Sequence, residues 1–475
     1  MSKPHNLIYI VADQWRGDCL GLYRNQHPVM TPHLNQLAGE GVHFPHAYAD
    51  CPICMPQRMT MLTGQSGSQL RCVKNFNERT APQIVSSQTL PARLAREAGY
   101  QTKAIGKMHF AAHRARYGFE HVSLHPDDYL WWLEDVGQGG TFRGHGLGGN
   151  EVYPTAATTE ERYYHTTWIV DQAIRYLEQR DPEQPFFLFI IFEAPHSPFD
   201  PPPPYDRMYD NFTIPDPAIG DWREDGYPAT FTARRYMSKC DYLQPEAIRE
   251  ARRRYYGQMS QIDYQLGRFF GALKSQGLDR DTAIAFTSDH GECLGDHGIF
   301  AKHCFLESAA RVPFILRLPA EARDRLEANA SGTPVLTADL CPTFLDLAGV
   351  ETDPQSDGRS LLRPLERKYI FGETPESAMA VGNGFKYVYY ATGGIEQLFN
   401  TKQDPDDIRN LAGKDTYAAM QSELKAALAT YLEKNGSPLI EDGAFVSRPV
   451  EIDPVQLRRN NPAACRGPMY GGDGY

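Results

Sequence analysis

Residues 6–13 read NLIYIVAD, a short apolar run that ends at Asp13. Three other runs have the same character, being apolar, hardly interrupted by polar residues and closed by charged or imidazole side chains: YQTKAIGKMH (100–109), PFFLFIIFEAPH (185–196) and TAIAFTSDH (282–290). Such runs are typical of strands that are buried on both faces of a mostly parallel sheet. We therefore expect a large sheet of this kind at the centre of the protein.

Helical patterns lie between these runs. Within 245–275 the apolar residues recur at helical spacing, and they are Ile262, Leu266, Phe269, Phe270 and Leu273. The alternation of strands with helices predicts an α/β sandwich.

The ends of the four predicted strands carry the candidate functional residues. In α/β sheets, ligands bind beyond the carboxyl ends of the strands. A single polar residue there is commonly an ordinary loop residue, whereas several at one edge predict a site. The residues that fall there are Asp13, Lys107, His109, His196, Asp289 and His290.

The character of the sequence changes after Leu365. Three short segments are aromatic and β-branched, with Gly-rich turns between them, and a helical pattern follows around 416–434. We expect a large domain at 1–365 and a small antiparallel sheet with a packed helix at 366–447. The arm at 448–475 is rich in Pro, Gly, Arg and Asn, and is interpreted either as an extension over a neighbouring subunit, hence a homo-oligomer, or as a loose tail.

The composition disfavours several kinds of partner. The net charge of −11 argues against nucleic acid and anionic membranes, which need an extended basic surface, but not against a small anion held in a local pocket. No stretch approaches the roughly 20 apolar residues of a membrane helix. The N-terminal apolar run is interpreted as a buried strand and not as a signal peptide. Together with nine scattered cysteines, this predicts a cytoplasmic protein.

Residues 51–64, CPICMPQRMTMLTG, contain two cysteines three positions apart. A redox pair would need thioredoxin-like surroundings, and a structural zinc site would need a second ligand pair; the sequence offers neither. Pro56 suits the first turn of a helix, which places Cys54 at a helix N-terminus, where the dipole and free N–H groups favour an anion. Arg58 lies one turn further on and points the same way.

The run from Cys54 to Arg58, followed by Leu-Thr-Gly at 62–64, resembles the C-x-P-x-R signature of the sulfatases. In that family a formylglycine-generating enzyme oxidises the cysteine to formylglycine, an aldehyde that hydrates to a diol, and the arginine can hold the diol oxygens. The resemblance covers about residues 5–412. The segments that carry it are DQWRGDCLGLYRN, TPHLNQLAGEGVHFPHAYAD, AIGKMHF, EAPHSPF, SDHGECLGDHGIFAKHCFLESAARVPFILRLP and FKYVYYATGGIEQLFNTKQDPDDIRNL.

The resemblance implies an alkaline-phosphatase-like sandwich. Its catalytic domain, at 1–365, would hold a large mixed, mostly parallel sheet flanked by helices. The segment 366–447 would be a small C-terminal α+β subdomain with an antiparallel sheet.

The resemblance also implies a bound divalent cation, with Asp13, Gln14, Asp289 and His290 as its ligands. Many sulfatases bind calcium through other residue pairs. Choline-sulfatase-like and phosphonate-monoester-hydrolase-like relatives share the pairs found here and use manganese. Both Ca²⁺ and Mn²⁺ stay open.

The implied mechanism begins with attack of the Cys54-derived diol on sulfur. Lys107 and Lys302 would neutralise charge on the sulfuryl oxygens, together with the metal. His196 resembles the acid that protonates the leaving oxygen, and His109 resembles the base that takes a proton from the second hydroxyl.

Two further residues are candidates for substrate binding. Asn75 resembles a substrate-side residue of the choline-sulfatase-like branch. Trp131, with Trp132, is a candidate for the wall of a leaving-group pocket, with core packing as the alternative.

Four functions are therefore weighed. The first is hydrolysis of a small-molecule or saccharide sulfate ester by an arylsulfatase-like sulfuric ester hydrolase. The second is hydrolysis of a phosphonate monoester or phosphodiester by the same residues. The third is a non-catalytic anion- or metal-binding homologue, and the fourth is a thiol-redox role for Cys51 and Cys54. The Leu-Thr-Gly segment and the C-terminal segment favour the first.

Overall fold

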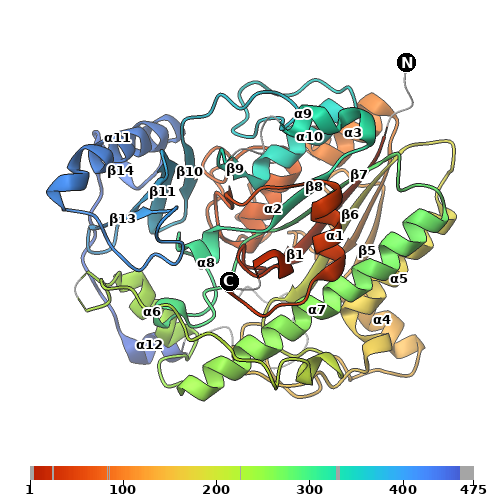
Figure 1. Cartoon of the computed structure of the whole chain (residues 1–475), viewed down its shortest axis with the longest axis horizontal. Coiled ribbons are helices and arrows are strands. Elements are labelled where there is room, and N and C mark those ends of the chain that lie inside the picture. Colours follow the sequence, from red (N-terminus) through yellow and green to blue (C-terminus); the bar gives the residue numbers. More distant parts are fainter. Residues whose placement is uncertain are drawn as a thin grey trace.

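A mixed seven-stranded sheet forms the centre of the protein (Figure 1). The structure is a computed structural model and describes residues 5–23, 26–82, 84, 86–224, 226–327 and 332–459. The strands, in the order in which they lie, are β2 (Val42–His43), β8 (Phe314–Arg317), β7 (Thr282–Ser288), β1 (Asn6–Asp13), β6 (Phe186–Pro195), β4 (Gln101–Gly106) and β5 (His121–Leu124). Strands β7, β1, β6, β4 and β5 run parallel, whereas β8 is antiparallel to β7 and β2 to β8.

The sheet is buried on both faces, as its apolar runs predict. Leu7, Tyr9 and Val11 of β1 join the hydrophobic core on one face, while Ile8 and Ile10 join the core on the other. Every residue of β6 is buried. The continuous apolar character of these strands therefore follows from having helices on both sides.

Helices cover both faces of the sheet. One core includes residues of α2 (Cys54–Thr63), α3 (Leu90–Ala98), α9 (Arg323–Glu327) and α10 (Leu340–Leu347). The other includes residues of α1 (Pro32–Glu40), α4 (Asp127–Asp135), α5 (His165–Gln179) and α7 (Pro245–Ser275). None of the helices within the described residues is long and apolar enough to cross a membrane.

A second, antiparallel sheet lies beside the first (Figure 1). Its strands are β10 (Ile370–Glu373), β11 (Ser377–Gly382), β12 (Phe385–Tyr390) and β13 (Ile395–Asn400). One face packs on α11 (Ala418–Asn435), and the other shares a core with the region of α8 (Glu307–Ala310). Among the described residues there are also two separate two-stranded sheets. One pairs β3 (Ala47–Tyr48) with β9 (Val335–Leu336), and the other pairs β14 (Ile440–Glu441) with β15 (Ala444–Phe445). The predicted fold class, including the small antiparallel sheet, is confirmed.

The described part of the C-terminal arm returns to the body of the protein. Arg448 forms a β-bridge with Thr392, and α12 (Pro454–Arg459) packs against α6 (Ala229–Met237). Residues 460–475 of the predicted arm lie outside the described residues. The division of the chain at residues 365 and 447 stays a prediction.

Candidate active site

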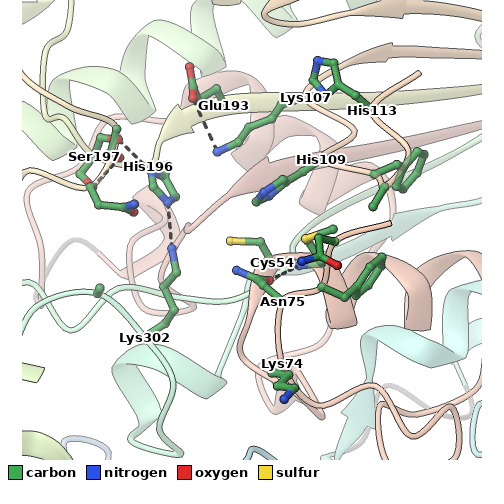
Figure 2. A pocket seen from close by; sticks show the side chains of 18 of the residues that line it. Cys54, Lys74, Asn75, Lys107, His109, His113, Glu193, His196, Ser197 and Lys302 are labelled. Atoms are coloured by element: carbon green, nitrogen blue, oxygen red, sulfur yellow. Dashed lines mark hydrogen bonds and ion pairs between the residues drawn. The ribbon is translucent and has the colours of Figure 1, made fainter. Parts of the chain in front are cut away.

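A cavity of about 840 Å³ lies where β4 and β6 end (Figure 2). Its volume falls in the usual range for ligand pockets, about 300–1,000 Å³. The structure brings six of the predicted site residues to its wall: Cys54, Asn75, Lys107, His109, His196 and Lys302. We call it the active-site cavity below.

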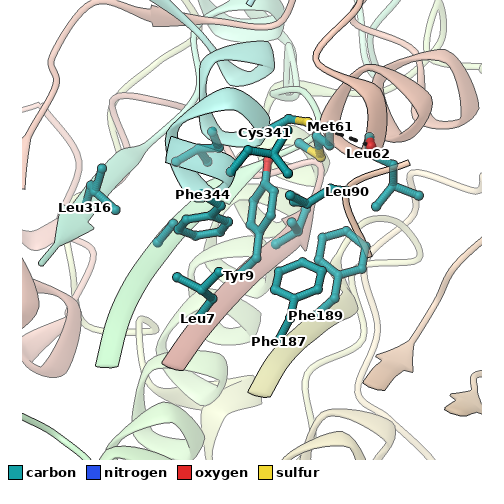
Figure 3. Packing of buried hydrophobic residues seen from close by; sticks show 14 of the residues in the cluster. Leu7, Tyr9, Met61, Leu62, Leu90, Phe187, Phe189, Leu316, Cys341 and Phe344 are labelled. Carbon is teal, nitrogen blue, oxygen red and sulfur yellow. Dashed lines mark hydrogen bonds between the residues drawn. The ribbon is translucent and has the colours of Figure 1, made fainter. Parts of the chain in front are cut away.

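Helix α2 presents Cys54 to this cavity from its first position. The N–H group of Met55 donates to Asn75 Oδ1 (3.1 Å), so Asn75 caps the helix that carries Cys54. The far end of the helix is anchored in the core, where Met61 and Leu62 pack close to Cys341 (Figure 3). All residues from Cys54 to Leu62 are buried, so α2 is enclosed along its length, and Cys54 at its N-terminus borders the cavity.

Arg58 lies beneath Cys54, with no exposed surface, and joins two strand ends. Its Nη2 atom lies 2.6 Å from Asp13 Oδ2 and 2.9 Å from Asp289 Oδ2. It also donates to the carbonyl oxygen of Lys107 (2.7 Å). Arg58 thus compensates two buried carboxylates and ties β1, β4 and β7 together at their carboxyl ends.

The other carboxylate oxygens face an imidazole. His290 Nε2 lies 3.7 Å from Oδ1 of both Asp13 and Asp289, and 3.1 Å from the sulfur of Cys54. The four ligand atoms lie within 4.8 Å of one another, and all four residues are buried. Two carboxylates and an imidazole that converge without exposure to solvent fit a divalent cation.

Gln14 lies next to this cluster, but its side chain is engaged elsewhere. Its amide nitrogen donates to Glu292, and its amide oxygen accepts from Lys302. Its backbone N–H donates to Asp289 Oδ1 (3.1 Å), which helps to orient that carboxylate. A direct bond from Gln14 to a metal stays a prediction.

The thiol of Cys54 lies among cationic and imidazole groups. Burial alone would raise its pKa, yet Lys302 and His290 outweigh burial and hold the pKa well below its ordinary value. The site therefore stabilises negative charge at position 54.

His196 and Lys302 form a neutral–cationic pair on one side of Cys54. His196 Nδ1 donates to the carbonyl oxygen of Ser197 (2.8 Å), and Nε2 accepts from Lys302 Nζ (2.8 Å). Burial, followed by the nearby Lys302, lowers the pKa of His196 to about 4. In the resting site His196 is therefore neutral, and the lone pair on its Nε2 accepts the hydrogen bond from Lys302.

His109 completes the surroundings of Cys54. It follows β4, lines the active-site cavity and hydrogen-bonds the Cys54 thiol. Burial lowers its pKa despite that bond, so His109 is also a neutral imidazole able to accept a proton.

Lys107 is held by carboxylates on two sides. Its Nζ atom lies 2.8 Å from Asp13 Oδ2 and 3.6 Å from Glu193 Oε1. Glu193 in turn pairs with Arg143 (2.9 Å). Sequence reasoning missed Glu193, although it stands at the end of a strand, three residues before His196. Arg143 lies in a loop with no motif that could have indicated it.

Trp131 is not brought to the active-site cavity. On α4, Tyr129 and Leu133 face the core, so Trp131 points outward; it is 60% exposed and Arg114 lies over its ring. Trp132 packs against Tyr129, as the core-packing alternative requires. The leaving-group role predicted for Trp131 has no support from its position.

Cys51 lies apart from the cavity wall. It is fully buried, and its thiol donates to the carbonyl oxygen of Val73 (3.6 Å). Burial raises its pKa well above the ordinary value, which is the opposite of a reactive thiol.

The sulfatase family model matches residues 5–350. The chain belongs to the sulfatase family. An arylsulfatase from Clostridium perfringens is 33% identical over 469 residues, with 91% of this chain and 95% of the relative covered. An N-acetylglucosamine-6-O-sulfatase from Bacteroides thetaiotaomicron is 26% identical over 507 residues, with 90% and 86% covered.

The crystal structure of the phosphonate monoester hydrolase of Agrobacterium radiobacter superposes on this sulfatase with a TM-score of 0.75. The two chains are 26% identical, and 94% of this chain and 100% of the other are covered. The predicted membership of the sulfatases, within the alkaline phosphatase superfamily, is confirmed. The protein is a sulfuric ester hydrolase.

Proposed function

We propose that this sulfatase hydrolyses a sulfate monoester with a formylglycine made from Cys54 as its nucleophile. The observation that carries the proposal is the position of Cys54, at the N-terminus of α2 and between the two neutral imidazoles of His109 and His196. The thiol occupies the place where the diol of formylglycine would lie. A hydroxyl of that diol would supply the oxygen that attacks sulfur.

One divalent cation, Ca²⁺ or Mn²⁺, belongs to the proposal. Asp13, Asp289 and His290 would hold it, with Gln14 as the fourth predicted ligand. When bound, it would supply positive charge to the sulfuryl oxygens. Lys107 and Lys302 provide further positive charge from the cavity wall.

Two histidines would move protons. The Nε2 atom of His196 faces the cavity beside Lys302, so it would pass a proton to the leaving oxygen, with Lys302 as the adjacent donor. His109 hydrogen-bonds position 54 and would take the proton of the second hydroxyl, which releases sulfate and restores the aldehyde.

The nucleophile is tested by mass spectrometry of the peptide that contains Cys54, from protein made with and without a formylglycine-generating enzyme. The proposal expects conversion of the thiol to an aldehyde and activity only in the converted protein. An unmodified Cys54 in a fully active enzyme would contradict it. Metal analysis of the same sample, with reactivation by Mn²⁺ or Ca²⁺ after chelation, identifies the cation.

Hydrolysis of a phosphonate monoester or phosphodiester is the second candidate, and the similarity to the phosphonate monoester hydrolase of A. radiobacter favours it. The same matured sample should be assayed with 4-nitrophenyl sulfate and with a 4-nitrophenyl phosphonate monoester. A higher kcat/KM for the phosphonate would replace the sulfate proposal.

A saccharide is our proposed leaving group. The active-site cavity exceeds the size of a sulfate group several times, and the N-acetylglucosamine-6-O-sulfatase similarity supports a sugar. The cytoplasmic location and the homo-oligomer stay predictions.

A further inference from the structure

Arg234 is an unpaired guanidinium on the wall of the active-site cavity. It projects from α6, is partly buried and lines the cavity together with Lys302 and His303. Within the described residues it forms no ion pair, and its side chain makes no hydrogen bond. The arginines that are fully buried behave differently, since Arg58 and Arg252 each pair with carboxylates.

Removing a cation from water without a partner costs free energy. Burial accordingly lowers the pKa of Arg234. A guanidinium presents its N–H donors as a rigid planar fork, which matches the oxygens of a carboxylate or a sulfate. An anion that reaches Arg234 would therefore gain charge-assisted hydrogen bonds and relieve its burial.

The cations of the cavity are not equally available to such an anion, and two of them, Lys74 and Arg79, are exposed to water. Lys107 and Arg143 are already paired with the carboxylate of Glu193. Lys302 contacts the neutral groups of Gln14 and His196 and stands beside the reacting position.

Arg234 lies where the active-site cavity meets a smaller one of about 190 Å³, because it lines both, as do Met237, Lys302 and His303. The sulfate that is cleaved needs only the end of the large cavity at Cys54. The rest, including the wall at Arg234, would face the leaving group.

We infer that Arg234 binds a second anionic group, a carboxylate or a further sulfate, on the saccharide from which the sulfate is removed. The inference rests on the proposed function and adds to it a class of substrate, acidic or multiply sulfated saccharides. It also makes α6, which no sequence motif indicated, part of substrate recognition.

The test compares esters that differ in the second anionic group. One pair is glucosamine 2-N,6-O-disulfate with N-acetylglucosamine 6-sulfate; the other is methyl iduronate 2-sulfate with the corresponding methyl idoside 2-sulfate. In the matured, metal-loaded enzyme, kcat/KM should be higher for the member that carries the second anionic group, called the anionic member below, in at least one pair. The pair that shows this preference tells whether the second group is a sulfate or a carboxylate.

Arg234→Met should lower that preference, expressed as the ratio of the two kcat/KM values, by about tenfold or more and mainly through KM. Arg234→Lys should restore part of it. The matched control is Arg235→Met, because Arg235 is the next residue of α6 and lines neither cavity. A ratio within twofold of wild type in Arg234→Met, or no preference for the anionic member of either pair in wild type, overturns the inference.

A binding measurement separates this inference from the proposed function. Calorimetric titration of Cys54→Ala with the same four esters needs neither maturation nor turnover. Weaker binding of the anionic member when Arg234→Met is added supports the inference even in a protein that hydrolyses none of them. Equal affinity of Cys54→Ala for both members of each pair counts against the inference. So does an equal loss of affinity for both members when Arg234→Met is added.

Discussion

At the scale of single residues, the contacts of the pair His196–Lys302 constrain the proton transfer that we propose for the leaving group. Because Nδ1 of His196 donates to a backbone carbonyl, only Nε2 is available on the cavity side. Because His196 is neutral in the resting site, the proton would come from one of two sources. It would be passed on by Lys302, or it would be taken from water once the negative charge of the bound substrate raises the pKa of the imidazole.

The variant His196→Asn should lose more activity toward esters whose leaving group needs a proton than toward esters whose leaving group does not. With saccharide sulfates, whose leaving alkoxide is strongly basic, we expect kcat to fall by about 10²–10⁴. With 4-nitrophenyl sulfate, whose leaving group departs readily as an anion, the loss should be much smaller. Steady-state kinetics on both esters check this; equal losses would mean that His196 does not act as the acid.

His125, which lines the active-site cavity, makes the stability of the protein depend on pH. It is 3% exposed, and neither ring nitrogen has a hydrogen-bond partner among the described residues, although Nε2 lies 3.5 Å from Glu193 Oε2. Burial outweighs that carboxylate and lowers the pKa of His125 to about 4. The unfolded chain therefore binds this proton first, near pH 6.5. The contribution to stability is complete above that pH and is lost as the pH falls toward 4, by about 3 kcal/mol at most.

The variant His125→Phe should reduce this loss, because His125 is surrounded by the rings of Tyr129, Phe142 and His165 and an added phenyl ring needs no proton. Urea unfolding at pH 7.5 and pH 5 measures the effect. Wild type should lose more free energy of unfolding than the variant between these values; identical losses would contradict the assignment.

At the scale of elements, α2 depends on a residue outside it. Asn75 caps the helix by accepting the N–H of Met55, so Asn75→Ala should cost about 1 kcal/mol of stability. Asn75→Asp keeps the acceptor and should preserve stability, but its negative charge in the cavity should raise KM for sulfate esters. Thermal unfolding and kinetics on the two variants separate the capping role from the substrate-binding role. Equal KM values in Asn75→Asp and wild type would contradict the substrate-binding role of Asn75.

The strands of the main sheet could be predicted because burial on both faces leaves an uninterrupted apolar run, and the positions of Asp13 and His196 follow from where such runs end. Contacts between residues that are distant in the sequence could not be predicted in this way. That Asn75 caps α2, that Glu193 holds Lys107 and that Arg234 reaches the cavity depend on loops and helices whose placement no local pattern encodes. Trp131 shows the converse error, since an aromatic pair does not say which member faces the core.

At the scale of the whole molecule, Lys386 joins the antiparallel sheet to α8 and to the segment after β13. It lies on β12 with no exposed surface and pairs with Glu307 (2.8 Å) and Asp407 (2.9 Å). Lys386→Met would leave the buried carboxylate of Asp407 without a cation and Glu307 with Arg311 alone (3.3 Å), so we expect the free energy of unfolding to fall by about 3–5 kcal/mol. The matched control is Lys368→Met, an exposed lysine paired with Glu423, which should change stability by less than about 1 kcal/mol. Similar losses in both variants, measured by urea unfolding, would contradict this account.

The burial of α2 has a consequence for biosynthesis. Cys54 is 3% exposed, and Arg58 is completely enclosed by the finished fold. An enzyme that recognises this stretch and oxidises its cysteine cannot reach it in the native protein, and must act while the chain is still extended. In the maturation that we propose, the yield of active protein is then decided by the relative rates of oxidation and folding, and a molecule that folds first keeps a thiol at position 54.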